Sequence, residues 1–352
     1  MQLNIKNNSE NFLESKNILV TGGAGFIGSA LIRRLIETTN SKVFNLDKLS
    51  YAGNLNSINN LFKANNLLDE KRHELLKVDL TNFEKTHDAI MHADPDIVFH
   101  LAAESHVDSS IKNPKIFIQS NVFGTYNLLE AVRQHHQKLN PKRKGSFKFH
   151  HISTDEVFGS LSLEGKFDEE SQYKPQSPYS ASKASSDHLV KAWGNTFDIP
   201  TLITNCSNNY GPWQHAEKLI PLAIKNALNQ KQIPLYGNGE NIRDWLYVED
   251  HIDALLLVAS IGIIGETYCI GGNSEIKNKD ILLKICNLLE EIIPNQKGYS
   301  RLITHVKDRK GHDFRYAINN YKIKKNLGWE AKHNFEEGIR KTINWYIKYY
   351  QS

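Results

Sequence analysis

Two short strings in the middle of the chain carry side chains that could move protons. Tyr179 and Lys183 are four residues apart, so on a helix they would share one face. An ammonium group beside a phenol favours the phenolate and lowers its reference pKa of about 10, which makes tyrosine usable as a general base. Thr154, Asp155 and Glu156 precede this pair. Burial and like charge would raise the pKa of at least one of the two carboxyls, which could then act as an acid.

A glycine-rich string near the N-terminus is typical of a dinucleotide-binding turn. Residues 21–28 read Thr-Gly-Gly-Ala-Gly-Phe-Ile-Gly and lie between an apolar run and a segment with helical spacing. Glycines there let the backbone approach a pyrophosphate, and the helix N-terminus offers free N–H groups. Asp47 ends the next apolar run, where a carboxylate can bind both ribose hydroxyls and repel a 2′-phosphate. We therefore expect NAD, with NADP left open by the neighbouring Lys48.

The hydrophobic pattern predicts the elements that would position these residues. Strands alternate with helices, which indicates an α/β fold of the Rossmann type, a doubly wound parallel sheet with right-handed crossovers. The alternation loosens after residue 211. We expect strands at 16–21, 41–46, 73–78, 96–101, 147–152, 201–205, 233–236 and 266–270, and helices at 26–37, 114–137, 178–194, 249–260 and 278–293.

Three regions follow from this pattern. We expect a flexible tail over residues 1–14, an NAD-binding Rossmann domain over 15–205, and a smaller C-terminal region over 206–352. That region should bind mainly the substrate and be partly interleaved with the first. Residues 138–148 are rich in lysine and arginine, and we interpret them as a solvated loop rather than a nucleic-acid signal.

Composition excludes several classes of protein. The chain has 352 residues, 40% hydrophobic and 23% charged, with a net charge of +4, which favours a soluble globular protein over one that binds nucleic acid. No apolar run is long enough to span a membrane. Three scattered cysteines argue against disulfides and for a reducing compartment, so we expect a cytoplasmic protein. The pairs at 135–136 and 150–151 are histidines without a complete ligand set, so no metal is expected.

The chain resembles the extended short-chain dehydrogenase/reductase family over nearly its full length. The resemblance rests on residues 21–28, 101–103, 179–183 and 208–212. Longer strings resemble those of the family members that dehydrate dTDP-glucose, and these are residues 47–54, 102–108, 153–157, 243–251 and 308–313.

The resemblance implies a three-step reaction on a nucleotide sugar. Tyr179, helped by Lys183 and Thr154, would take the C4 hydroxyl proton while hydride passes from C4 to NAD. Glu156 would then remove the C5 proton while Asp155 protonates the departing C6 hydroxyl. Hydride would return to C6, giving dTDP-4-keto-6-deoxyglucose and water. NAD would be regenerated in each turnover and would stay tightly bound.

The resemblance also implies binding residues and an assembly. Cofactor contacts are expected from Gly22, Gly25, Phe26, Ile27, Gly28, Asp47, Lys48, Ser50, Asp79, Leu80, Leu101, Ala102, Ala103, Ser120, Tyr179, Lys183 and Asn209. Substrate contacts are expected from Ser105, Thr154, Asn208, Lys218, Leu219, Pro234, Tyr236, Arg243, Asn278, Asp308 and His312. A homodimer through the helices at 114–137 and 178–194 is expected.

Some alternatives stay open. Arg243 suits a bidentate phosphate contact, with an ion pair to Asp244 or Glu240 as the other interpretation. His312 could be a core histidine. The chain departs from the usual strings at Ser109, Phe158 and Lys310. The other functions considered are a 4,6-dehydratase for a different nucleotide sugar, an enzyme like UDP-glucose 4-epimerase, and a non-catalytic NAD-binding regulator.

Overall fold

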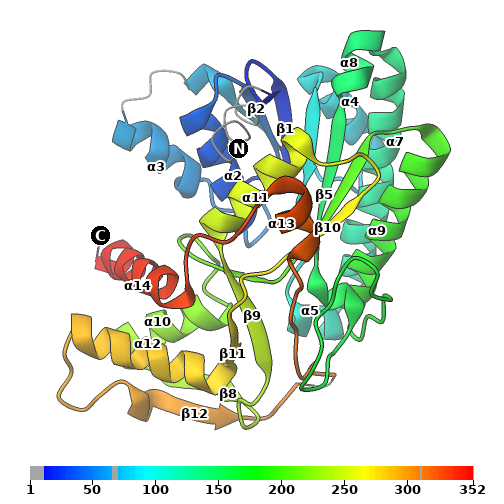
Figure 1. Cartoon of the computed structure of the whole chain (residues 1–352). Coiled ribbons are helices and arrows are strands. Elements are labelled where there is room, and N and C mark those ends of the chain that lie inside the picture. Colours follow the sequence, from blue (N-terminus) through cyan, green and yellow to red (C-terminus); the bar gives the residue numbers. More distant parts are fainter. Residues whose placement is uncertain (1–11, 66–69, 310, 352) are drawn as a thin grey trace.

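Seven parallel strands form the central sheet of the molecule (Figure 1). The computed structural model describes residues 12–65, 70–309 and 311–351. The strand order is β10-β6-β5-β4-β1-β2-β3, which contains the 3-2-1-4-5-6 order of a Rossmann sheet, so the predicted fold class is confirmed. The strands are β1 (Asn17–Thr21), β2 (Lys42–Leu46), β3 (His73–Leu76), β4 (Ile97–His100), β5 (Lys148–Thr154), β6 (Thr201–Cys206) and β10 (Thr267–Ile270).

Side chains that alternate along the strands pack into two hydrophobic cores, one on each face of the sheet. Ile18 and Val20 of β1 pack in one core, whereas Leu19 between them packs in the other. The first core is covered by α2 (Phe26–Thr38), α3 (Asn56–Asn65), α11 (Val248–Ile261) and α13 (Tyr321–Leu327). The second is covered by α4 (Phe83–Ala93), α7 (Gly124–Lys138) and α9 (Pro178–Phe197).

The C-terminal part of the chain builds a second, smaller lobe and returns twice to the first. Figure 1 shows α11 beside α2, and α13 beside α11, above the smaller lobe. Between these returns the chain forms a three-stranded sheet, β11-β9-β7, and a pair, β12-β8. The elements are β7 (Asn208–Tyr210), α10 (Leu219–Leu228), β8 (Ile233–Tyr236), β9 (Ile242–Tyr247), β11 (Glu275–Lys277), α12 (Asn278–Ile292), η4 (Ser300–Leu302), β12 (Ile303–Val306) and α14 (Phe335–Gln351).

The long helix predicted over 114–137 is interrupted. It consists of α6 (Pro114–Phe117), a π-helical segment η2 (Ile118–Phe123) and α7, preceded by α5 (Val107–Lys112). Within η2, the Asn121 amide accepts from Glu104 N (2.8 Å) and donates to Glu104 O (3.0 Å) and Ser182 Oγ (2.8 Å). Such wide turns are frequent at functional sites. This one fixes Asn121 against the loop that follows β4.

One prediction about the surface is wrong. The expected loop at 138–148 contains a short helix, α8 (Pro141–Ser146), because Asn140 caps the Arg143 N–H and Pro141 occupies the first turn. Arg143 then pairs with Asp94 (2.8 Å) and Asp96 (2.8 Å). Of the expected tail, residues 1–11 lie outside the described residues, but Leu13 is buried in the first core. Lys310 also lies outside the described residues.

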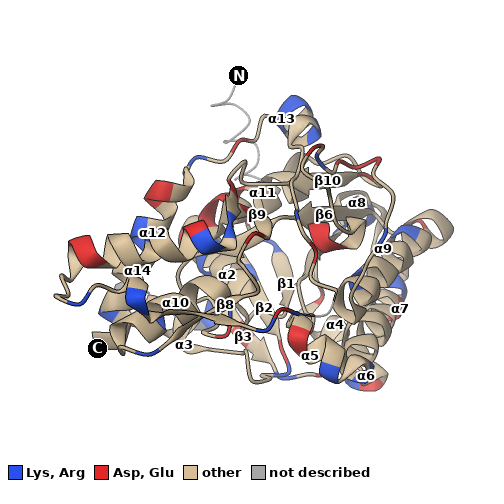
Figure 2. Ribbon diagram, turned by 90° about the horizontal axis from the view of Figure 1, so that it is seen from below, with Lys and Arg blue, Asp and Glu red and all other residues tan. Residues whose placement is uncertain are grey.

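Charged side chains of both signs are interspersed over the molecule (Figure 2). Within the described ranges, no helix is both long and apolar enough to span a bilayer.

Candidate active site

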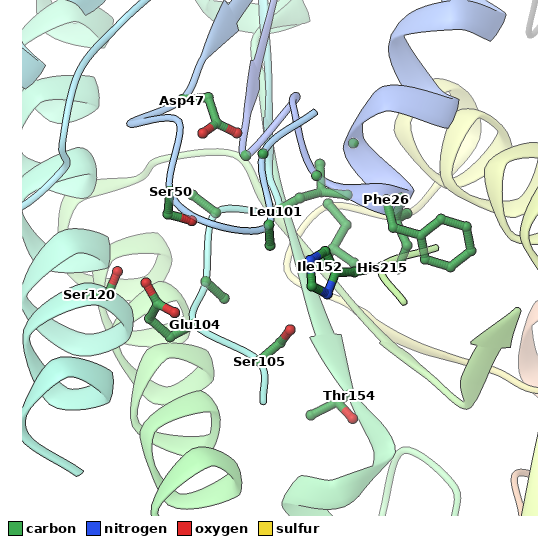
Figure 3. A pocket seen from close by; sticks show the side chains of 18 of the residues that line it. Phe26, Asp47, Ser50, Leu101, Glu104, Ser105, Ser120, Ile152, Thr154 and His215 are labelled. Carbon is green, nitrogen blue, oxygen red and sulfur yellow. The ribbon is translucent and has the colours of Figure 1, made fainter. Parts of the chain in front are cut away.

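A cavity of about 310 Å³ runs along the carboxyl ends of the parallel strands (Figure 3). In this view Asp47 and Thr154 lie at opposite ends, with Leu101 and Ile152 between them. Every residue expected to contact the cofactor lines this cavity. Parallel sheets of this order bind ligands in that position because the strand order reverses there.

The glycine turn fits a dinucleotide because its backbone leaves no room for side chains. Gly22 has φ +69°, and a Cβ there would lie 2.8 Å from Ala102 Cα. A Cβ on Gly28 would lie 2.2 Å from Gly22 O. Helix α2 begins after Gly25 without a side-chain cap, so its first N–H groups remain available to an anion.

Asp47 is held at the end of β2 by the backbone. Its carboxylate accepts from Ala24 N (3.0 Å) and Leu49 N (2.7 Å), which leaves further lone pairs on both oxygens. The neighbouring Lys48 does not stand free, because its Nζ pairs with Glu104 Oε1 at 2.8 Å. The lysine that left NADP open is thus neutralised by a carboxylate.

A second cavity of about 410 Å³ adjoins the first. Both cavities are lined by Ser105, Glu156, Asn208, Asn209, Gln214, Glu217 and Lys218. Of the expected substrate contacts, Thr154 lines only the first cavity, and Leu219, Pro234, Tyr236, Arg243, Asn278 and His312 line only the second. Asp308 lines neither, and its Oδ1 lies 2.7 Å from His312 Nδ1 instead.

Arg243 presents a positive charge to the second cavity. Its guanidinium donates to the carbonyls of Ile242 (2.8 Å) and Asp313 (3.0 Å) and lies 4.4 Å from the Tyr316 ring centroid. In the described part of the chain it has no carboxylate within 4.0 Å, so the alternative ion pairs with Asp244 and Glu240 are wrong.

The cavity around Arg243 contains further cations. Lys218 donates to Ser105 O (3.0 Å), and Arg309 lies 2.8 Å from Asp108 Oδ1. A diphosphate matches this charge.

Tyr179 and Lys183 lie on the first turns of α9. Ser177 and Ser180 cap this helix reciprocally, and Pro178 opens it, which explains why it starts where it does. Both side chains line the first cavity and are nearly buried. Lys183 Nζ donates to Ile152 O at 3.0 Å.

The expected lowering of the tyrosine pKa is wrong. Burial, followed by the charges of Glu156 and Cys206, raises the pKa of Tyr179 well above its ordinary value, and only a hydrogen bond with Thr154 opposes them. The reason is that the phenol lies near carboxylates from another element while the ammonium of Lys183 is directed to a carbonyl.

The adjacent carboxyls differ in environment. Burial first, and then the charge of Glu156, raise the pKa of Asp155 well above its usual range, as expected for at least one of the pair. Burial also raises the pKa of Glu156, but Arg243 and Lys218 oppose it. Asp155 lines neither cavity. Thr154 Oγ1 donates to its Oδ1 (3.3 Å), and its Oδ2 has no hydrogen-bond partner in the described structure.

The loop over residues 213–218 lines both cavities, and of its residues only Lys218 was predicted. Gln214 Nε2 donates to Asn209 O (2.8 Å), and Tyr51 OH donates to Glu217 Oε1 (3.3 Å). This loop directly follows the string at 208–212, which was the available signal. Of the departures, Phe158 packs on Phe167, 5.2 Å between centroids, and lines neither cavity.

Known proteins resemble this chain over nearly its full length. The family model described as GDP-mannose 4,6 dehydratase matches residues 19–342. The chain is 53% identical to a dTDP-glucose 4,6-dehydratase of Shigella flexneri, covering 94% of this chain and 92% of the relative. The dTDP-glucose 4,6-dehydratase of Bacillus anthracis, solved in complex with NAD, has a TM-score of 0.80 and 42% identity, covering 94% and 96%. The dTDP-glucose 4,6-dehydratase of Streptomyces venezuelae, also solved with NAD, has a TM-score of 0.82 and 38% identity. This match covers 94% of this chain and 97% of that one.

Proposed function

Since this chain belongs to the GDP-mannose 4,6 dehydratase family, and within it to the dTDP-glucose 4,6-dehydratases, we propose that it converts dTDP-glucose to dTDP-4-keto-6-deoxyglucose and water. The observation that carries the proposal is the position of Glu156, which lines both cavities. A sugar at that junction would lie between a cofactor in the first cavity and a nucleotide diphosphate in the second.

The cofactor is NAD. The backbone around Gly22 and the Asp47 carboxylate suit its pyrophosphate and ribose. When bound, NAD supplies a cationic ring that accepts hydride from C4 of the sugar and later returns it to C6. Because the dinucleotide leaves the reaction in the form in which it entered, the enzyme has no need to release it between turnovers.

The chain's own residues supply the proton transfers. The C4 hydroxyl proton passes to the phenolate form of Tyr179, which the hydrogen bond with Thr154 favours. Lys183 on the same helix face and the cationic ring of bound NAD would supply the positive charge that this form needs. The resulting C4 ketone makes the C5 proton acidic. Glu156 removes that proton, and its nearby cations Arg243 and Lys218 favour the ionised form that a base requires.

We assign to Asp155 the proton that leaves with the C6 hydroxyl. Because Asp155 lines neither cavity, this proton would pass through Thr154 Oγ1, which lies 3.3 Å from Asp155 Oδ1 and lines the first cavity. Burial and the charge of Glu156 raise the pKa of Asp155, which favours the protonated carboxyl that an acid requires, and its Oδ2 has no hydrogen-bond partner in the described structure. Water is lost across C5 and C6, which makes the enzyme a carbon–oxygen lyase. Proton return to C5 as hydride reaches C6 completes the product.

Transfer of deuterium from C4 to C6 tests the proposal. With C4-deuterated dTDP-glucose we expect a 4-keto product that carries deuterium at C6, detected by mass spectrometry and NMR. Conversion to the galactose isomer would refute dehydration in favour of epimerisation. Binding without turnover would leave only a regulator. Turnover of other glucose nucleotides at equal kcat/KM would refute the preference for dTDP.

We also propose that two copies pair through the helices around α7 and α9 in the cytoplasm. Large apolar side chains are exposed there, led by Phe123 at 57% exposure and joined by Ile116, Ile118, Tyr126 and Phe197. The three cysteines are buried free thiols, which suits a reducing compartment. Phe123→Asp should give monomers by light scattering, whereas Leu163→Asp, at an exposed loop position, should not.

A further inference from the structure

Asp187 lies one turn beyond Lys183 on α9. Tyr179, Lys183 and Asp187 therefore follow one another at four-residue intervals on one face of the helix. The Asp187 side chain is completely buried, and it lines neither cavity. A buried carboxylate that no ligand reaches must be satisfied by the protein itself.

Four donors from other elements surround this carboxylate. On β5, Ser153 Oγ donates to Oδ2 (2.9 Å) and His151 Nε2 lies 3.1 Å from Oδ1. Tyr173 OH donates at 2.8 Å, and Asn205 Nδ2 on β6 donates at 3.2 Å. Burial alone would raise the pKa of Asp187, but the bonds from His151 and Ser153 and the charge of Lys183 bring it below its ordinary value. Asp187 is therefore ionised at neutral pH.

Lys183 is a buried ammonium that needs an opposing charge. Its side chain is 4% exposed, and burial lowers its pKa. Asp187 opposes that shift more than any other group.

The other titratable groups around Lys183 cannot replace Asp187. The pKa of Cys206 on β6 is raised to about 12 by burial, so its thiol is neutral. His151 on β5, 3.4 Å from Lys183 Nζ, has its pKa lowered to about 4, and His100 on β4 is likewise shifted down by burial. Tyr179 is neutral as well, because its pKa is raised.

We propose that Asp187 is a positioning residue that keeps Lys183 protonated and fixes the catalytic face of α9 against β5 and β6. The proposal rests on the role given to Lys183 in the proposed function. Because His151 and Ser153 belong to the strand that ends at Thr154, one carboxylate ties the helix carrying Tyr179 and Lys183 to the strand carrying the other proton-transfer groups. Asp187 acts through Lys183 and does not touch the substrate.

The test is the pH profile of the NAD-bound enzyme. Asp187→Asn removes the charge and keeps the shape. Lys183 should then lose its proton at a lower pH. The alkaline limb of the kcat/KM profile should therefore move to lower pH by about one unit or more, and kcat/KM above that limb should fall about tenfold. Activity should recover on acidification. Asp187→Glu retains the charge and should keep the limb near its wild-type position.

Matched controls separate charge from packing. Tyr173→Phe, at a residue that lines neither cavity, removes one hydrogen bond from Asp187 and no charge, so it should lower thermal stability without moving the limb. Asp187→Ser provides a second neutral variant if Asp187→Asn does not fold. A folded neutral variant with the wild-type limb would overturn the positioning role, whereas absence of wild-type turnover of dTDP-glucose would overturn the proposed function instead.

Discussion

Replacing Gly22 with alanine should weaken both the fold and NAD binding. The residue has φ +69°, and its new Cβ would lie 2.8 Å from Ala102 Cα and N and 3.0 Å from Leu101 C, all backbone atoms. The left-handed conformation costs about 1–2 kcal/mol for a residue with a Cβ. Overpacking against backbone adds about 1–3 kcal/mol, for about 2–5 kcal/mol in total.

Two other glycines separate these contributions. Gly298 has φ +67° with nothing within 4 Å of its Cβ, so Gly298→Ala should lose only about 1–2 kcal/mol. Gly145 lies in α8 with open space and without a positive φ, so Gly145→Ala should be neutral or gain up to about 1 kcal/mol. Denaturant unfolding gives the free energies, and the NAD content of the purified protein gives the cofactor effect.

The relative stabilities and NAD contents of the three variants test this prediction. Gly22→Ala should be the least stable of the three and should be purified with less than the full complement of NAD. The two control variants should retain NAD as wild type does. If Gly22→Ala has the same free energy of unfolding as Gly298→Ala and retains NAD, the contact of the loop after β4 with the glycine turn has no energetic role.

Three further predictions concern the site. Glu156→Gln should reduce turnover by about 10²–10⁴-fold while NADH absorbance still develops on mixing with substrate, because C4 oxidation does not need this base; unaltered turnover would exclude the role. Asp155 binds its proton more tightly in the folded state, so the wild-type protein loses stability as the pH rises from about 4 through the raised pKa of this carboxyl. The thermal stability of Asp155→Asn should therefore increase relative to that of the wild type with increasing pH. A difference in stability that does not depend on pH would contradict this. Arg243→Ala should raise KM by about tenfold or more with NAD content unchanged, whereas Arg340→Ala, an exposed arginine paired with Glu291, should leave KM unaltered.

The central sheet could be predicted because buried parallel strands are short apolar runs with sharp ends. Residues 17–21 and 42–46 are of this kind, and all but the first residue of each is buried. The three-residue strands β7 and β11 of the smaller lobe contain one apolar residue each, so no pattern marks them. Their pairing with β9 depends on contacts remote in sequence.

The residues that line the two cavities were mostly predictable, with Asp155 and Asp308 as exceptions, but the electrostatics of the site were not. The cofactor contacts follow strand ends, which the pattern places well. By contrast, Asp155 and Glu156 are neighbours in sequence, yet only Glu156 reaches the cavities because the turn η3 (Asp155–Phe158) directs them apart. The raised pKa of Tyr179 depends on burial and on a carboxylate from another element, neither of which spacing can reveal.

The seventh strand has a consequence for how the chain is made. β10 completes the sheet by pairing with β6, but the ribosome delivers it only after β7 to β9 and α11. Until then β6, whose six residues are all buried in the finished protein, presents an open edge with unpaired N–H and C=O groups. Until residue 270 has emerged, a nascent chain therefore carries an unpaired β6 edge, which favours misassociation.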